Sequence, residues 1–199
     1  MWFTVRAFPV AIFLFLFASA VHAQGEVDSL YSQAVQAHDS GEFERAIALY
    51  SDVIELDANH ANAYWNRANL WPDEQNARAL EDYKQVARLA PDFDAAFGNY
   101  GFTLLLENRL MDARKASLKA YRLDNTVYSW PLNIGHTYML EGKPDSARIY
   151  YRWAIFRMES REDLDGAVSD FDTFIERGWK PETSSAMRIW MMKSYEGRD

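Results

Sequence analysis

The stretch FERAIALYSDVIEL, residues Phe43–Leu56, decides the fold because its pattern returns three more times along the chain. Its small residue Ala46 recurs at steps of 33, 34 and 34 residues, and a second marker follows four positions after each copy of it. The recurring positions are Ala46, Ala79, Ala113 and Ala147, followed by Tyr50, Tyr83, Ser117 and Tyr151. A repeat of this length predicts a solenoid, built by stacking copies of one small unit.

Each copy carries two helical patterns, which predict a pair of antiparallel helices. In Phe43–Leu56 the apolar side chains recur at steps of three and four residues, the spacing of one helix face. A second ladder of small residues lies upstream with the same period, at Ala34, Ala68, Gly101 and Gly135. Gly41 separates the two patterns of the first copy, and we expect it to adopt a left-handed conformation that ends the first helix.

The copies define the expected domain organisation. We expect four repeats within residues 24–161, at about 27–60, 61–93, 94–127 and 128–161. Residues 162–199 leave this register, and two further helical patterns there, at Leu164–Arg177 and from Lys180 to about Glu196, predict capping helices. The side chains expected to seal the end of the array are Met187, Ile189, Trp190 and Met191.

The turn of the second copy is irregular. It is one residue shorter than its siblings near Pro72–Asn76, and Pro72 is expected to end or kink the helix after Trp71. Surface loops tolerate such changes, so this turn is either a local irregularity or a contact loop.

The repeated positions resemble the tetratricopeptide repeat. The bulky, small and aromatic positions of the family's first helix are matched in the third copy by Phe97, Tyr100, Gly101 and Leu104, and in the fourth by Trp130, Ile134, Gly135 and Tyr138. The resemblance covers about residues 27–161. It implies an all-α, right-handed superhelical solenoid whose first helices line a concave groove for a protein or peptide partner.

The resemblance also implies which side chains contact that partner. The groove positions are Tyr31, Trp65, Asn69, Phe102, Leu105, His136 and Met139. They are largely aromatic and apolar, and an exposed surface of that kind favours binding. The alternative is that the capping helices, or a second copy of the protein, cover them.

One function of the family is excluded. Members that capture the acidic tails of cytosolic chaperones use a clamp of Lys, Asn, Asn, Lys and Arg. The matching positions here are Tyr31, Val35, Asn66, Ala95 and Asn99. Only Asn66 agrees, and no cation remains to meet a carboxylate.

The first 23 residues predict a secretory signal peptide. A single basic residue, Arg6, precedes an apolar run at residues 8–20, and small side chains follow up to Ala23. We expect cleavage after about Ala23 and a periplasmic or secreted bacterial protein, the alternative being an uncleaved anchor. The chain has no cysteine, which excludes disulfides, thiolate metal sites and a lipoprotein acceptor.

The charge composition argues against two classes of partner. The chain has 29 acidic and 21 basic residues, a net charge of −8. This balance argues against nucleic acid and against a membrane partner beyond the signal peptide, since both favour basic surfaces.

No catalytic or metal-binding pattern stands out. The histidines after the signal peptide are His38, His60 and His136, too widely spaced for a helical metal pair. The carboxylates of Asp170 and Asp172, two positions apart, are expected to be solvated charges at a helix end. The sequence therefore predicts no enzyme, metal or cofactor. It favours an exported adaptor that binds a partner segment, with a self-assembling structural protein of the cell envelope as the alternative.

Overall fold

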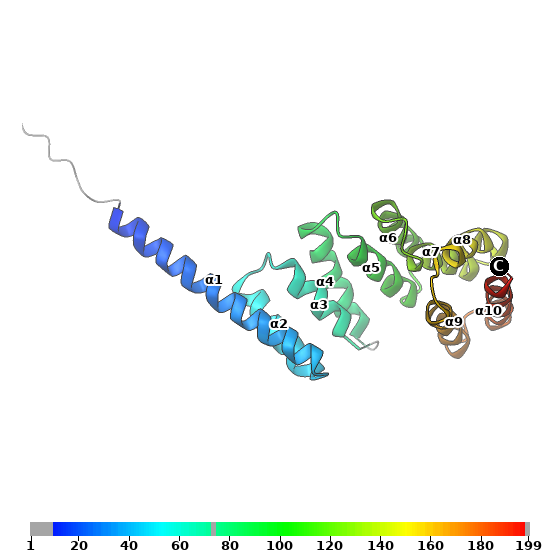
Figure 1. Ribbon diagram of the computed structural model, residues 1–199, viewed down its shortest axis with the longest axis horizontal. Helices are drawn as coiled ribbons and strands as arrows, with labels where there is room; N and C mark the ends of the chain where they lie inside the picture. The colour runs from blue at the N-terminus through cyan, green and yellow to red at the C-terminus, as the bar shows by residue number, and fades with distance from the viewer. Residues whose placement is uncertain (1–9, 73–74, 198–199) are drawn as a thin grey trace, which may run out of the picture. The chain divides into compact units, whose positions relative to one another are not determined.

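The computed structural model describes residues 10–72 and 75–197, and side chains from Gln24 onward (Figure 1). Over these residues all regular secondary structure is helical, which confirms the predicted all-α class. The helices are α1 (Val10–Asp39), α2 (Phe43–Leu56), α3 (Ala61–Leu70), α4 (Asn76–Leu89), α5 (Asp94–Leu106), α6 (Leu110–Leu123), α7 (Ser129–Leu140), α8 (Pro144–Arg157), α9 (Arg161–Glu176) and α10 (Pro181–Glu196).

The chain divides into two compact units between Leu70 and Trp71. The first unit holds α1, α2 and α3, and its small core forms where α1 packs on α2. Ala34 and Ala46 are completely buried there, which allows the two helices to approach closely. Helix α2 has the bounds expected from the sequence, and Gly41 before it has φ +76°, the left-handed conformation that glycine favours.

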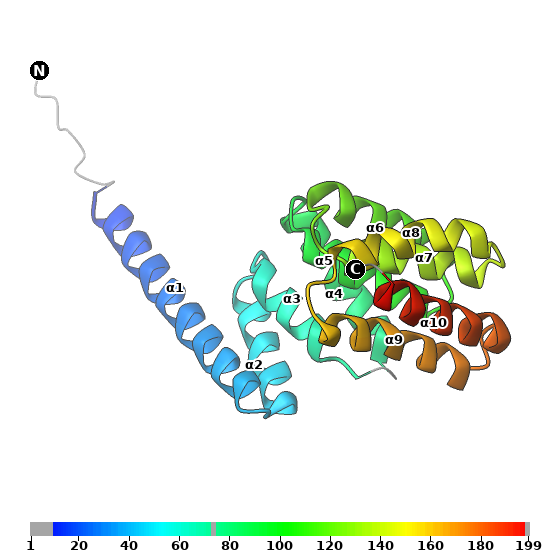
Figure 2. The same ribbon diagram turned by 45° about the vertical axis from the view of Figure 1, so that its right-hand side comes forward.

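The second unit holds α4 to α10. Within it, α5 pairs with α6, α7 with α8, and α9 with α10 (Figure 2). One continuous core runs through these pairs, and its largest fully buried side chains include Tyr151, Phe171, Phe174 and Leu104.

Contacts inside the second unit explain why the two sequence ladders exist. A Cβ atom on Gly135 of α7 would lie 2.4 Å from the Tyr151 ring of α8. A Cβ atom on Gly101 of α5 would lie 2.4 Å from the Ser117 hydroxyl of α6. In both pairs a glycine of the first helix faces the marker residue of the second helix. The ladders therefore record the contact line between the helices of a pair.

Helices α9 and α10 form the last pair. Helix α9 begins with a capping box, in which Ser160 accepts from the Asp163 amide and the Asp163 side chain accepts from the Ser160 amide. Met187 and Met191 of α10 are buried, as expected for a sealing face. The expectation for Ile189 is wrong, because its side chain lies on the outer face of α10 and is 54% exposed.

Two expectations fall partly outside the described residues. Residues 73–74 of the irregular turn lie outside them, and so do residues 1–9 of the expected signal peptide. The backbone of residues 10–23 is helical and continues into the rest of α1. Within the described part of the chain, no helix has the length and apolarity needed to cross a membrane.

Candidate functional site

A cavity of about 300 Å³ lies in the second unit, lined by α5, α7, α9 and the residues that lead into α7. Three aromatic side chains line it, from Phe102, Tyr128 and Trp130. The polar lining includes the amides of Asn99 and Asn133 and the carboxylate of Asp170. Among the described residues, no Lys or Arg lines this cavity.

The two amides reach the cavity because the helix pairs repeat. Asn99 and Asn133 are 34 residues apart and occupy equivalent places on α5 and α7. The Asn133 amide group donates a long hydrogen bond of 3.4 Å to the Gly98 carbonyl. The Asn99 side chain hydrogen-bonds with the Tyr83 hydroxyl of α4. Neighbouring helices thus hold both amides in place.

Trp130 depends on a glycine of the preceding pair. Its ring lies on Gly98, where a Cβ atom would come within 1.9 Å of ring atom Cζ3. Any side chain at Gly98 would displace the ring, so this close contact requires glycine. Trp130 is only 6% exposed, and its indole N–H has no hydrogen-bond acceptor among the described residues. The Nε1 atom is closed to solvent, so this unpaired donor is a cost within the fold and not a contact point of the cavity.

A chain of hydrogen bonds connects Asp170 with the core. His136 is fully buried, with Nε2 3.1 Å from Asp170 Oδ2 and Nδ1 3.0 Å from the Tyr151 hydroxyl. Burial, and secondarily the charge of Asp170, raises the pKa of Tyr151 well above its usual value, so this hydroxyl keeps its proton. A hydroxyl can both donate and accept, so Tyr151 pairs with Nδ1, while His136 Nε2–H donates to the carboxylate, which only accepts.

Aromatic rings fix the orientation of His136. The rings of Phe171 and Phe174 on α9 meet it edge-on, with centroids 5.1 and 4.9 Å from that of His136. The packed rings leave the imidazole no room to turn, so the hydrogen bond holds the Asp170 side chain at the cavity, where it is 20% exposed.

The electrostatic character of the cavity is negative. The pKa of Tyr128, which lines it, is raised first by burial and then by the charges of nearby carboxylates. Those carboxylates belong to Asp163, Asp170 and Glu162.

Of the contact residues expected from the sequence, Phe102 lines the cavity and is partly exposed. Leu105, His136 and Met139 are completely buried, which corrects the expectation that they face an open groove. Phe171 and Phe174 of α9 cover His136, and the Ser184 hydroxyl of α10 lies 3.9 Å from the Met139 sulfur. The capping helices α9 and α10 therefore cover His136 and Met139, as the alternative expectation had it.

The other three expected contact residues belong to the first unit. Tyr31 packs on His60, with ring centroids 4.6 Å apart, and its hydroxyl accepts a hydrogen bond of 3.0 Å from Asn66. Trp65 is half-buried on α3, and Asn69 is exposed there. The cavity is built by the second unit alone, so none of the three lines it.

Sequence reasoning missed most of the polar lining. Asp170 is not a solvated charge at a helix end: it lies in the middle of α9, where it accepts from a buried histidine. A signal for the amides was present, since asparagine recurs at Asn66, Asn99 and Asn133 with steps of 33 and 34 residues.

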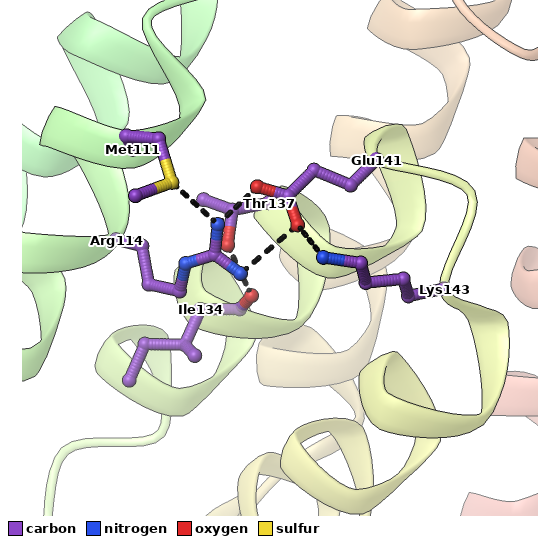
Figure 3. A network of polar contacts seen from close by, with 6 residues as sticks. All are labelled: Met111, Arg114, Ile134, Thr137, Glu141 and Lys143. Atoms are coloured by element: carbon purple, nitrogen blue, oxygen red, sulfur yellow. Dashed lines mark hydrogen bonds and ion pairs between the residues drawn. The ribbon is translucent and has the colours of Figure 1, made fainter.

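A second polar network ties α6 to the end of α7 (Figure 3). The Arg114 guanidinium donates to both carboxylate oxygens of Glu141, and Lys143 Nζ lies 2.9 Å from one of them. The same guanidinium lies over the Tyr138 ring, 4.3 Å from its centroid. These contacts, that with Arg114 foremost, lower the pKa of Glu141 below its usual value. We interpret this network as structural.

Comparisons with known proteins bear on the fold. No family model matches the chain. It is 30% identical over 122 residues to the human protein O-mannosyl-transferase TMTC3, an alignment of 59% of this chain and 11% of that protein. It is 27% identical over 100 residues to a small glutamine-rich tetratricopeptide repeat-containing protein of Mycosarcoma maydis, covering 50% of this chain and 28% of that one. The chain thus spans less than a third of these curated relatives.

Solved structures resemble the chain more completely. YrrB, described as a tetratricopeptide repeat protein with an unusual peptide-binding site, superposes with a TM-score of 0.63 over 92% of this chain and 93% of its own, at 19% identity. The chain has the tetratricopeptide-repeat fold. MamA from Desulfovibrio magneticus RS-1 matches with a TM-score of 0.62 and 20% identity over 68% of this chain and 77% of that one. The first repeat domain of RPAP3, bound to an HSP90 peptide, matches with a TM-score of 0.56 and 16% identity. The match covers 58% of this chain and 93% of that one. At these identities the likeness concerns the fold.

Proposed function

We propose that this protein is an exported tetratricopeptide-repeat scaffold that binds a segment of a partner protein across α5, α7 and α9. The observation that carries the proposal is the cavity, where two amides one repeat apart accompany three aromatic side chains. The description of RPAP3 as bound to a peptide, and of YrrB as having a peptide-binding site, supports the use of this fold for such binding.

The lining suits a polypeptide. An asparagine amide both donates and accepts, so Asn99 and Asn133 can pair with the N–H and C=O groups of a peptide backbone. Phe102 and Tyr128 offer large rigid surfaces for apolar parts of the segment.

Catalysis is not part of the proposal. The alignment with the mannosyl-transferase covers 11% of that protein, so its activity is not transferred to this chain. Among the described residues, no group of three or more His, Cys, Asp and Glu side chains is placed to hold a metal ion.

The binding site is tested by photo-cross-linking in the cell envelope. A benzophenone amino acid in place of Phe102 should give a discrete adduct with one partner. The matched control places it at Ile189 of α10, which is 54% exposed and does not line the cavity. An additional Asn99→Ala substitution should abolish the Phe102 adduct. Equal adducts from both positions, or none from Phe102, would contradict the proposed site.

Export is tested separately. The chain expressed in a bacterial host should be recovered from the periplasm or medium, and its intact mass should correspond to a chain that begins at about Gln24. We call this product the processed chain. An intact chain retained in the membrane fraction would instead support an uncleaved anchor.

Self-assembly is the second candidate function. It is favoured by an exposed apolar stripe on α8, where Ile149, Trp153 and Phe156 recur at helical spacing. Light scattering of the processed chain should then show an oligomer that Phe156→Glu dissociates, whereas a monomer at all concentrations would exclude this function.

A further inference from the structure

We propose that the cavity selects a partner segment with a Lys or Arg side chain, whose cationic group pairs with Asp170 against the aromatic walls. The proposal rests on the function proposed above and names the chemistry of the partner. It makes Asp170 a residue that determines specificity.

The Asp170 carboxylate is available for a further contact. Within the described residues, its carboxylate makes one hydrogen bond, from His136, and no Lys or Arg pairs with it. A carboxylate can accept several hydrogen bonds, so this one leaves acceptor capacity unused. Its side chain is 20% exposed, so a ligand cation in the cavity can reach the carboxylate, and their attraction there is stronger than in bulk water.

Buried groups behind Asp170 hold its carboxylate in position. The fully buried His136 is held by Tyr151 on one side and by the rings of α9 on the other. Its Nε2 lies 3.1 Å from Asp170 Oδ2 and donates to the carboxylate. The negative charge is therefore fixed in position before any ligand arrives, which reduces the cost of ordering it on binding.

The size and lining of the cavity suit a Lys or Arg side chain. A volume of about 300 Å³ is at the lower end of small-ligand pockets and suits one long side chain with its adjoining backbone. Lys and Arg carry an apolar stem that packs on apolar surface and a charged head that attracts aromatic faces. Phe102, Tyr128 and Trp130 provide those surfaces, beside the carboxylate.

The charged side chains around the cavity are acidic. Glu162 and Asp163 act on Tyr128 together with Asp170, so the potential at this wall of the cavity is negative. A negative site with no lining cation repels acidic segments and attracts basic ones. This is the reverse of the chemistry expected for acidic chaperone tails, whose clamp residues the sequence lacks.

The test is a titration of the ¹⁵N-labelled processed chain, followed through the indole N–H resonance of Trp130, which Trp130→Phe assigns. The probes are three capped pentapeptides of Gly and Ser that differ only in a central Lys, Gln or Glu. We expect the Lys peptide to shift the resonance saturably, with a Kd at least about tenfold below that of the Gln peptide. The Glu peptide should cause no saturable shift.

Asp170→Asn is the decisive variant, because its amide oxygen still accepts from His136 while the charge is lost. It should reduce the affinity for the Lys peptide to that of the Gln peptide. The matched control is Asp165→Asn, at an exposed carboxylate on the same helix that pairs with Arg161, and it should leave all three titrations unchanged. If Asp170→Asn does not fold, the three titrations of the wild-type chain still test whether the cavity selects a cation.

The outcomes separate this proposal from the one it rests on. Equal binding of all three peptides would overturn the selection of a cation and leave a peptide-binding site. Preference for the Glu peptide would overturn it as well. No shift with any peptide would overturn both the selection and the proposed binding site.

Discussion

Two carboxylates of the second unit are buried to a similar degree and yet have very different surroundings. Glu141 is 16% exposed and meets two cations, Arg114 and Lys143. Asp170 is 20% exposed and accepts a hydrogen bond from the buried His136. Glu141 thus has two cationic side chains as partners, whereas Asp170 lies at a cavity and pairs with no Lys or Arg of the described residues. We infer that Glu141 serves the fold and that Asp170 is available to a ligand.

The largest expected effect follows from removing the carboxylate of Glu141. Glu141→Ala leaves the Arg114 guanidinium, which is 11% exposed, without its carboxylate. Because an unpaired buried charge is costly, we expect the free energy of unfolding to fall by about 2 kcal/mol. Urea denaturation followed by circular dichroism measures it. Asp145→Ala, which removes an exposed carboxylate paired with Arg148, is the control and should have no measurable effect.

A smaller loss is expected from removing the support of Asp170. His136→Leu leaves the Asp170 carboxylate and the Tyr151 hydroxyl without their shared partner, at a cost of about 1–2 kcal/mol. Because the two residues act as a unit, the costs of His136→Leu and Asp170→Ala should not add in the double variant. Simple additivity in urea denaturation would show that Asp170 does not depend on His136.

The pH dependence of stability sharpens the contrast. Arg114 foremost, and then Lys143, lower the pKa of Glu141 from its usual 4.5, so the folded state holds this carboxylate ionised at lower pH than the unfolded state does. Its stabilising contribution is complete above pH 4.5 and disappears as pH falls through the folded pKa. The Tm difference between wild type and Glu141→Gln should therefore be constant from pH 6 to 7 and shrink below pH 4.5. A difference that grows as pH falls below 4.5 would contradict this linkage.

The smallest expected effect belongs to Asp170 itself. Asp170→Asn keeps the acceptor for His136 Nε2–H and removes a charge that no described cation matches. We expect its free energy of unfolding to stay within about 0.5 kcal/mol of wild type. Chemical denaturation of this variant beside Glu141→Gln makes the comparison direct, and equal losses in the two would remove the distinction between the networks.

The sequence predicted the fold well because the fold is periodic. Ala46 and its copies, together with the upstream ladder through Gly101 and Gly135, mark contacts that every helix pair must make. The structure shows those contacts as glycines facing Ser117 and Tyr151. Such a signal is local and repeated, so one chain is enough to reveal it.

The candidate site was harder to predict because it depends on contacts between different pairs. Phe102 was recognised from its register on a first helix, and Asn99 and Asn133 follow the same register. Asp170 gained its role only because α9 brings it against His136, which is 34 residues away in the sequence. The same packing buried Met139, which periodicity alone placed on an open face.

The most direct test of the contrast between the two carboxylates is a crystal structure of the processed chain soaked with the Lys pentapeptide. We expect the lysine Nζ at about 3 Å from an oxygen of Asp170, within the cavity, with no peptide near Glu141. A lysine bound at any other place, or a peptide in the cavity whose lysine points away from Asp170, would contradict it.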